Sequence, residues 1–242
     1  MANTEVDHKL RVYSDIVQLV ANPQNPTPLV RVNRINPNKD FQIYLKLERY
    51  NPFGSVKDRI AYEMLKVLET DGKTLVEASS GNTGIALACV ANALGIPIET
   101  AVPDKIPEEK KVMLKFLGAK LWEADDSLCP AFPSEGARGL VNALLKSPAT
   151  RDSYVSTNQY ENEVNVQAHY RLTGPEIWQQ TRGKIDCFFA AFGTCGTITG
   201  VGRYLKEQNP KVKIIAVEPS SSNHKLPGMK RITGLDEQYI PA

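Results

Sequence analysis

Two stretches of the chain repeat the same order of a strand, a short turn of small residues and a helix. The β-prone run 74–78 is followed by the turn 79–84 and then by an apolar run from 85 to 94. The apolar run 185–192 predicts a buried strand, and the turn 193–197 leads from it into a helix that reaches about 207. Strands that alternate with helices favour a mostly parallel sheet covered on both faces, with ligands at the carboxyl ends of the strands. We therefore expect an α/β protein.

Both turns are rich in glycine and in hydroxyl side chains. Such turns direct unpaired backbone N–H groups and hydroxyls at one point, with the helix dipole behind them, and so bind anions. Any tight connection from a strand to a helix also favours Gly, Ser and Thr without binding a ligand. A single turn of this kind is therefore weak evidence for an anion site.

A third stretch, 51–59, delivers Lys57 to the start of an amphipathic helix that continues with Ile60, Met64 and Leu65. A helix start carries partial positive charge and disfavours an ammonium group, so the pKa of a partly desolvated lysine there should be lowered. A neutral lysine is a better nucleophile toward carbonyl groups. The alternative is a solvated lysine in a capping region. Together with two anion sites, however, a nucleophilic lysine suits pyridoxal phosphate, a phosphorylated aldehyde, and an amino-acid substrate.

The motifs NPFGSVKDR (51–59), SGNTG (80–84) and GT-x-GT (193–197), in this order, resemble the cysteine synthase (O-acetylserine sulfhydrylase) and cystathionine β-synthase branch of the fold-type II pyridoxal-phosphate enzymes. The resemblance includes 27–29, 158–160 and 173–178, and runs from about 26 to the end of the chain. It implies a tryptophan synthase β-like fold of two three-layer αβα domains with mostly parallel sheets. We expect a small mobile subdomain at 47–147, and a larger cofactor-binding domain formed by 1–46 and 148–242.

The resemblance also implies a role for each matching residue. Lys57 matches the lysine that forms the Schiff base and removes the Cα proton, and Asn82 matches the residue that binds the ring hydroxyl of the cofactor. The phosphate cradle comprises Gly193, Thr194, Cys195, Gly196 and Thr197, and the substrate carboxylate pocket comprises Ser79, Ser80, Gly81, Thr83 and Gln159. Helix capping alone is the alternative explanation for the serines, the threonine and Asn82. Cys195 departs from the family, which has glycine there, but a small side chain that points away leaves N–H donation intact.

The implied activity is a β-replacement, in which L-cysteine forms from O-acetylserine and sulfide through an aminoacrylate. Lys230 and Arg231 lie where the family has a substrate-side loop, and two cations could accept the phosphate of O-phosphoserine; a solvated loop is the alternative. A haem-linked cystathionine β-synthase is disfavoured, because no cysteine precedes Cys89. Other lyases or synthases of β-substituted serines remain alternatives. So does a shortened non-catalytic regulatory homologue, since family members continue beyond the end of this chain and supply a Ser or Thr to the pyridine nitrogen.

Composition excludes several other classes of function. A net charge of +2 over 242 residues gives no electrostatic argument for binding nucleic acid. No apolar run reaches membrane-spanning length, and the first residues lead us to expect no signal peptide. Its four cysteines form no CxxC pair, which argues against a metal site and for the reducing cytoplasm. The resemblance further implies a homodimer, with serine acetyltransferase as a candidate partner.

Overall fold

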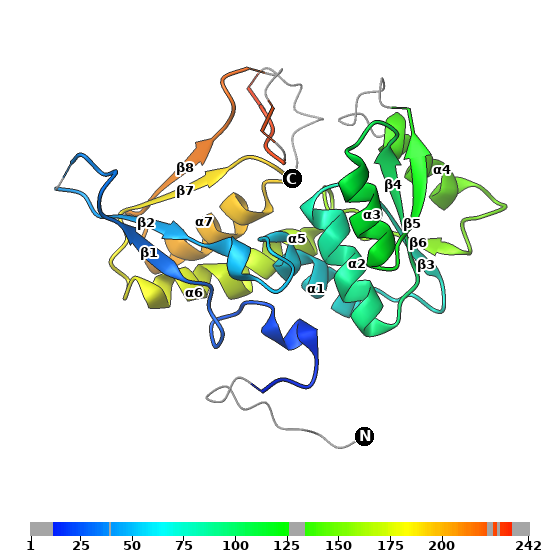
Figure 1. The fold of residues 1–242 in the computed structure, drawn as a ribbon. Coiled ribbons are helices and arrows are strands. Elements are labelled where there is room, and N and C mark those ends of the chain that lie inside the picture. Colours follow the sequence, from blue (N-terminus) through cyan, green and yellow to red (C-terminus); the bar gives the residue numbers. More distant parts are fainter. Residues whose placement is uncertain (1–11, 39, 126–133, 222–224, 227, 234–242) are drawn as a thin grey trace.

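The computed structural model describes residues 12–38, 40–125, 134–221, 225–226 and 228–233. Figure 1 shows two groups of elements side by side. One group is built on the strands between residues 74 and 155, and the other contains the strand pairs at 29–46 and 187–217. Helices α1 (Lys57–Val67) and α5 (Glu163–Ala168) lie between the two groups.

The first group contains a four-stranded parallel sheet in the order β5-β4-β3-β6. Its strands are β3 (Thr74–Ala78), β4 (Ile98–Pro103), β5 (Lys120–Ala124) and β6 (Tyr154–Val155). Successive side chains of a strand point to opposite faces, so Leu75 packs with α2 (Asn82–Leu94) and α3 (Glu108–Phe116), whereas Val76 packs with α4 (Gly136–Lys146). The sheet is therefore the middle of three layers, as expected for an α/β fold.

The second group contains two pairs of strands. Strand β1 (Leu29–Val32) pairs antiparallel with β2 (Ile43–Lys46), and β7 (Cys187–Ala191) pairs parallel with β8 (Lys213–Val217). Helices α6 (Gly174–Gln180) and α7 (Gly196–Gln208) share a core with the inner face of β7, through Ile177, Val201 and Phe188. The expectation that this strand is buried is wrong for its other face, where Phe189 is 60% exposed.

Helix α1 joins the two groups because two of its faces are buried. Ala61 and Leu65 belong to the core around α2, whereas Ile60 and Met64 pack against Ala168 of α5. From α5 the chain continues through a π-helical turn, His169–Thr173, into α6. The start of α1, and with it Lys57, therefore lies at the junction of the two groups (Figure 1).

Two further features bear on function. Across the described part of the chain, no helix has the length and apolar character needed to cross a membrane. Those same residues contain no group of three or more His, Cys, Asp or Glu side chains placed to hold a metal ion.

Candidate active site

Lys57 is the first residue of α1, and the loop before it is held by Asp58. The buried Asp58 carboxylate accepts hydrogen bonds from the Phe53 N–H at 2.6 Å and the Ser55 hydroxyl at 3.2 Å. Ser55 Oγ in turn accepts the Lys57 N–H at 3.1 Å. Gly54 has φ +88°, a conformation that a glycine adopts without strain. The NPFGSVKD stretch is thus a compact turn that fixes where α1 begins.

The amine of Lys57 lies in a poorly solvated site. Burial lowers the pKa of Lys57 from 10.5 to about 8, and the charge of nearby Lys230 adds to this effect. The same two ammonium groups act on the Cys195 thiol, so Lys57, Lys230 and Cys195 lie close together. Because a substantial fraction of an amine with this pKa is neutral near physiological pH, Lys57 has the character of a nucleophile and a base.

The turn opposite Lys57 connects β7 to α7. Gly196 is the first residue of α7, and Cys195 before it has φ +64°, in the left-handed region. The Cys195 side chain packs against Ile198 and Ile232. The backbone N–H groups of the first turn of α7 have no intrahelical acceptor and carry the positive end of the helix dipole. The turn therefore offers the donors that a phosphate group needs.

The packing around this turn leaves no space for side chains at two glycines. A Cβ on Gly193 would lie 2.8 Å from the carbonyl oxygen of Gly228, and one on Gly196 would lie 2.0 Å from Asn165 Oδ1. At Gly193 and Gly196 the turn thus exposes backbone without side chains, and Gly228 and Asn165 pack against it. This arrangement fits the close approach of a phosphate group. Together with Lys57, whose amine has a lowered pKa, these residues fit pyridoxal phosphate.

His169 is a residue of this site that sequence reasoning missed. Its Nε2 lies 3.1 Å from the hydroxyl oxygen of Thr197, and its Nδ1 lies 2.9 Å from that of Thr173. Burial lowers the pKa of His169 to about 3, and the charge of Lys57 contributes as well. A neutral imidazole therefore orients the Thr197 hydroxyl in the first turn of α7. The sequence did offer one indication: His169 precedes Thr173 by four residues, a spacing that places the two side chains on the same face of a helix.

The predicted substrate loop lies between β3 and α2. Gly81 caps α2 and Asn82 is its first residue, so Asn82 is not the cap. Ser79 Oγ accepts the Gly84 N–H at 3.0 Å, and the Thr83 hydroxyl donates to Gln159 Oε1 at 2.7 Å. The structure therefore brings Thr83 and Gln159 together across 76 residues. Since α2 packs against α1, this loop and Lys57 lie at the ends of neighbouring helices.

The segment that carries Lys230 and Arg231 returns to the end of β7. The Lys230 N–H donates to the Phe192 carbonyl at 2.8 Å, and its ammonium lies 4.0 Å from the centre of the Tyr160 ring. Glu218 Oε2 accepts the N–H groups of Ile232 at 2.7 Å and Thr233 at 3.0 Å. Arg231 is half-buried, and its charge acts on the Glu218 carboxylate. Lys230 thus reaches the surroundings of Lys57, whereas Arg231 is located toward Glu218.

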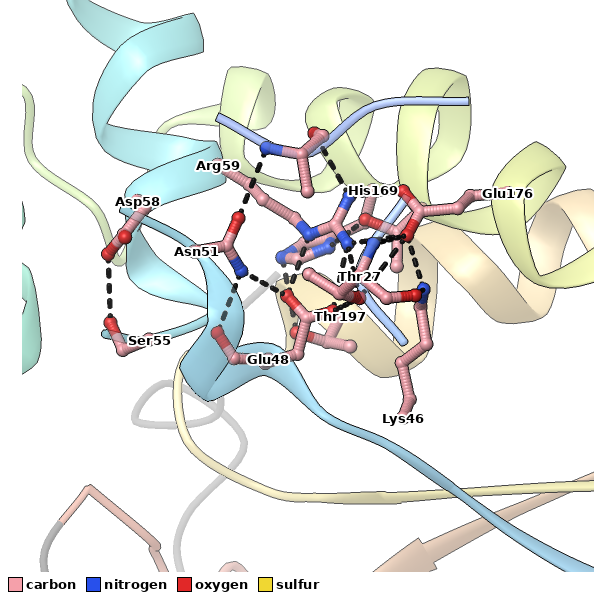
Figure 2. Close-up of polar contacts among 12 residues, drawn as sticks. Thr27, Lys46, Glu48, Asn51, Ser55, Asp58, Arg59, His169, Glu176 and Thr197 are labelled. Atoms are coloured by element: carbon pink, nitrogen blue, oxygen red, sulfur yellow. Dashed lines mark hydrogen bonds and ion pairs between the residues drawn. The ribbon is translucent and has the colours of Figure 1, made fainter. Parts of the chain in front are cut away.

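Four charged side chains form a cluster that we call the Arg59 quartet: Lys46, Glu48, Arg59 and Glu176 (Figure 2). Arg59 is fully buried and bonds both carboxylates through two nitrogens each, at 2.7 and 2.8 Å to Glu48 and at 2.7 and 2.9 Å to Glu176. Lys46 also pairs with Glu176. Two cations and two carboxylates cancel, so the buried cluster carries no net formal charge.

The quartet connects α1 to distant parts of the chain. Glu176 comes from α6, Lys46 from β2 and Glu48 from the 3-10 helix Glu48–Tyr50. Asn51 adds a further link, since it accepts the Ala21 N–H at 3.2 Å and donates to Glu48 at 3.0 Å. Figure 2 shows His169 and Thr197 next to this cluster. The first turn of α1 is thereby fixed relative to α6, which packs against α7.

Comparison with known proteins agrees with this geometry. A family model described as pyridoxal-phosphate dependent enzyme matches residues 20–236. The chain is 44% identical over 225 residues to a cysteine synthase of Aquifex aeolicus, covering 90% of this chain and 66% of that protein. It is 39% identical over 220 residues to cysteine synthase B of Escherichia coli, covering 89% of this chain and 69% of that protein.

Solved structures give the same result. The crystal structure of O-acetylserine sulfhydrylase isoform 3 from Entamoeba histolytica superposes with a TM-score of 0.78 at 32% identity, over 92% of this chain and 65% of that one. The chain thus spans about two thirds of the length of these relatives. The α/β class with mostly parallel strands is confirmed. By sequence and fold, the chain belongs to the family of pyridoxal-phosphate dependent enzymes, and the relatives that it resembles include cysteine synthases.

Proposed function

We propose that this chain forms L-cysteine from O-acetylserine and sulfide by β-replacement, as a pyridoxal-phosphate dependent transferase. The observation that carries the proposal is the placement of Lys57, whose pKa is lowered to about 8, near the bare turn at the start of α7. The names of the relatives support the same activity, since they are cysteine synthases and O-acetylserine sulfhydrylases.

Each group of residues would have one task in this reaction. Gly193, Thr194, Cys195, Gly196 and Thr197 would hold the cofactor phosphate, and Asn82 would bind the ring hydroxyl. Ser79, Ser80, Gly81, Thr83 and Gln159 would orient the substrate carboxylate. The bound cofactor supplies an aldehyde for the substrate amine and a ring that stores negative charge. Lys57 would hold the cofactor, remove the proton from Cα and return it, because a pKa of about 8 leaves a substantial fraction of its amine neutral near physiological pH.

The proposal extends to motion, location and assembly. We expect the subdomain 47–147 to move relative to the rest and to bring the loop at 79–83 closer to Lys57. We expect a homodimer in the cytoplasm, with serine acetyltransferase as a candidate partner, as the family resemblance implies. Leu45, Phe189 and Val217 are exposed apolar side chains on β2, β7 and β8. Their exposure supports a role for these strands in contacts with another polypeptide.

The activity can be tested directly on the purified protein. We expect pyridoxal phosphate to give a yellow complex, O-acetylserine to shift its visible band, and sulfide to restore the band while L-cysteine accumulates. Borohydride reduction followed by peptide mapping should locate the cofactor on Lys57. A yellow complex that never forms L-cysteine would contradict the proposal and favour a non-catalytic regulatory homologue.

The donor is a separate question, which Arg231 addresses. If Arg231 contacts the phosphate of O-phosphoserine, Arg231→Ala should lower kcat/KM for that donor by about 10- to 100-fold, since one charge-assisted hydrogen bond is lost. The value for O-acetylserine should stay within about twofold, because a neutral acetyl group gains no ion pair. Steady-state assays with both donors measure the ratio, with the exposed Lys225→Ala as control. An equal change for both donors would remove Arg231 from donor selection.

A further inference from the structure

One buried carboxamide lies between the two anion sites. Asn165 of α5 is 2% exposed, and its Nδ2 donates to the Gln159 carbonyl at 2.9 Å and to the Thr194 hydroxyl oxygen at 2.9 Å. Since a carbonyl can only accept, the nitrogen of the carboxamide must face Gln159, which determines the orientation of the group. Asn165 thus donates one N–H hydrogen to each site, through Gln159 and through Thr194.

Each of these bonds directs a neighbouring group. Because Thr194 Oγ1 accepts from Asn165, the hydroxyl hydrogen of Thr194 remains to donate, as a phosphate oxygen requires. On the other side, the Gln159 backbone is held by Asn165 while its Oε1 accepts from Thr83, so the Gln159 amide hydrogens remain to donate to a carboxylate. A continuous chain of contacts therefore runs from Thr83 through Gln159 and Asn165 to Thr194.

The carboxamide is also enclosed. Asn165 Oδ1 is buried and has no hydrogen-bond partner among the described residues. It lies against Gly196, where an added Cβ would be 2.0 Å away. A buried acceptor without a partner costs free energy, so a role in stability alone does not explain the group well. Its geometry is better explained by what its nitrogen holds.

We propose that Asn165 is a positioning residue that holds the phosphate cradle and the substrate carboxylate pocket in register. This inference rests on the proposed function, because it takes the cradle to bind phosphate and Gln159 to bind carboxylate. Occupation of the cradle orders Thr194 and, through Asn165, the Gln159 backbone. Binding at one site should therefore favour binding at the other, and linkage requires the effect to be reciprocal.

The test separates the phosphate from the rest of the cofactor. Equilibrium binding of pyridoxal phosphate and of pyridoxal, which lacks phosphate, is measured on the cofactor-free protein. We expect Asn165→Ala to lower the affinity for pyridoxal phosphate by about tenfold and to leave the affinity for pyridoxal unchanged, because only the orientation of the cradle is lost. Asn165→Asp, which has the same shape but cannot donate and adds a negative charge, should weaken the phosphate form further.

Asn162→Ala is the matched control. Asn162 caps α5 three residues away, accepting the Val164 N–H at 2.9 Å and donating to the Thr157 carbonyl at 2.8 Å. Its loss should lower the melting temperature without changing the ratio of the two affinities. Similarly, in the cofactor-loaded protein, Asn165→Ala should raise the half-saturating concentration of L-alanine but not that of L-alaninamide, which has no carboxylate.

The outcomes distinguish the inference from the proposed function. If the parent protein prefers pyridoxal phosphate to pyridoxal and Asn165→Ala retains the whole preference, the positioning role is wrong while the proposed function stands. An equal loss of affinity for both compounds would show general damage and also overturn the role. If the parent shows no preference for the phosphate, the cradle assignment fails and the inference fails with it.

Discussion

Lys57→Met should abolish L-cysteine formation, with kcat lowered by at least about 10³-fold, because the nucleophile and the base are lost together. Methionine retains the aliphatic length of lysine, so the surroundings of α1 change little. Cofactor should still bind through the cradle, but borohydride should no longer attach it covalently to the chain. The measurements are initial rates of cysteine formation and intact-protein mass after reduction.

Lys66→Met is the control for this variant. Lys66 lies on the same helix with its side chain 49% exposed, paired with Glu63 at 3.0 Å. Its replacement should leave kcat within about twofold, since exposed ion pairs contribute little. Retention of more than a tenth of the parent kcat in Lys57→Met would exclude Lys57 as the essential base.

Lys57→Met should also stabilise the cofactor-free protein. A lysine whose folded pKa is about 8 instead of 10.5 favours the neutral amine. Its stabilising contribution is therefore fully present above 10.5 and is lost as the pH falls through about 8. At pH 7 the parent should consequently be less stable than Lys57→Met by on the order of 1–3 kcal/mol, and the difference should fade toward pH 11. Urea denaturation at both pH values measures this.

Arg59→Met should lower the free energy of unfolding by about 3–5 kcal/mol, because it leaves the buried Glu176 and the partly buried Glu48 without their shared partner. Equilibrium denaturation measures the change. Arg59→Lys retains the charge but not the two-pronged hydrogen bonding, and it should cost less, about 2 kcal/mol. The lysine variant keeps the test informative if the methionine variant fails to fold.

The comparison variant is Arg203→Met, which breaks the exposed pair with Glu163, where the side chains are 53% and 56% exposed. It should cost no more than about 1 kcal/mol.

Burial alone would raise the pKa of Glu48, but hydrogen bonds and charge from Arg59 outweigh this and hold that pKa below 4.5. The contribution of Glu48 is thus present above 4.5 and is lost as the pH falls through its folded pKa. A cost of less than 1 kcal/mol for Arg59→Met at pH 7 would contradict the structural importance of the quartet.

The parts of the fold and site that follow from the sequence are those carried by local patterns. The alternation of strands and helices predicts the parallel sheet, and the three glycine-containing turns predict where Lys57, Thr83 and Thr194 lie. The departure at Cys195 is also readable locally, since glycine in relatives suggests a positive φ, and the structure has φ +64° there. The roles of these residues in binding remain predictions.

The remaining features depend on pairings between distant residues. Nothing near Glu176 indicates that it bonds Arg59, 117 residues away, or that Asn165 reaches Thr194, 29 residues away. The exposure of Phe189 was missed for a different reason. The run 187–192 is apolar on both faces. A continuous apolar run predicts burial of a strand on both sides, even when one face is open in the described structure.

The Arg59 quartet also sets an order of events during synthesis. Arg59 leaves the ribosome 117 residues before Glu176, which is a delay of about 6 to 23 s at ordinary elongation rates of about 5–20 residues per second. Until then, burial of Arg59 on α1 would leave its guanidinium with only part of the counter-charge that it has in the complete structure. The nascent chain therefore cannot complete this region piece by piece, and its native arrangement must form late, around a contact of long sequence separation.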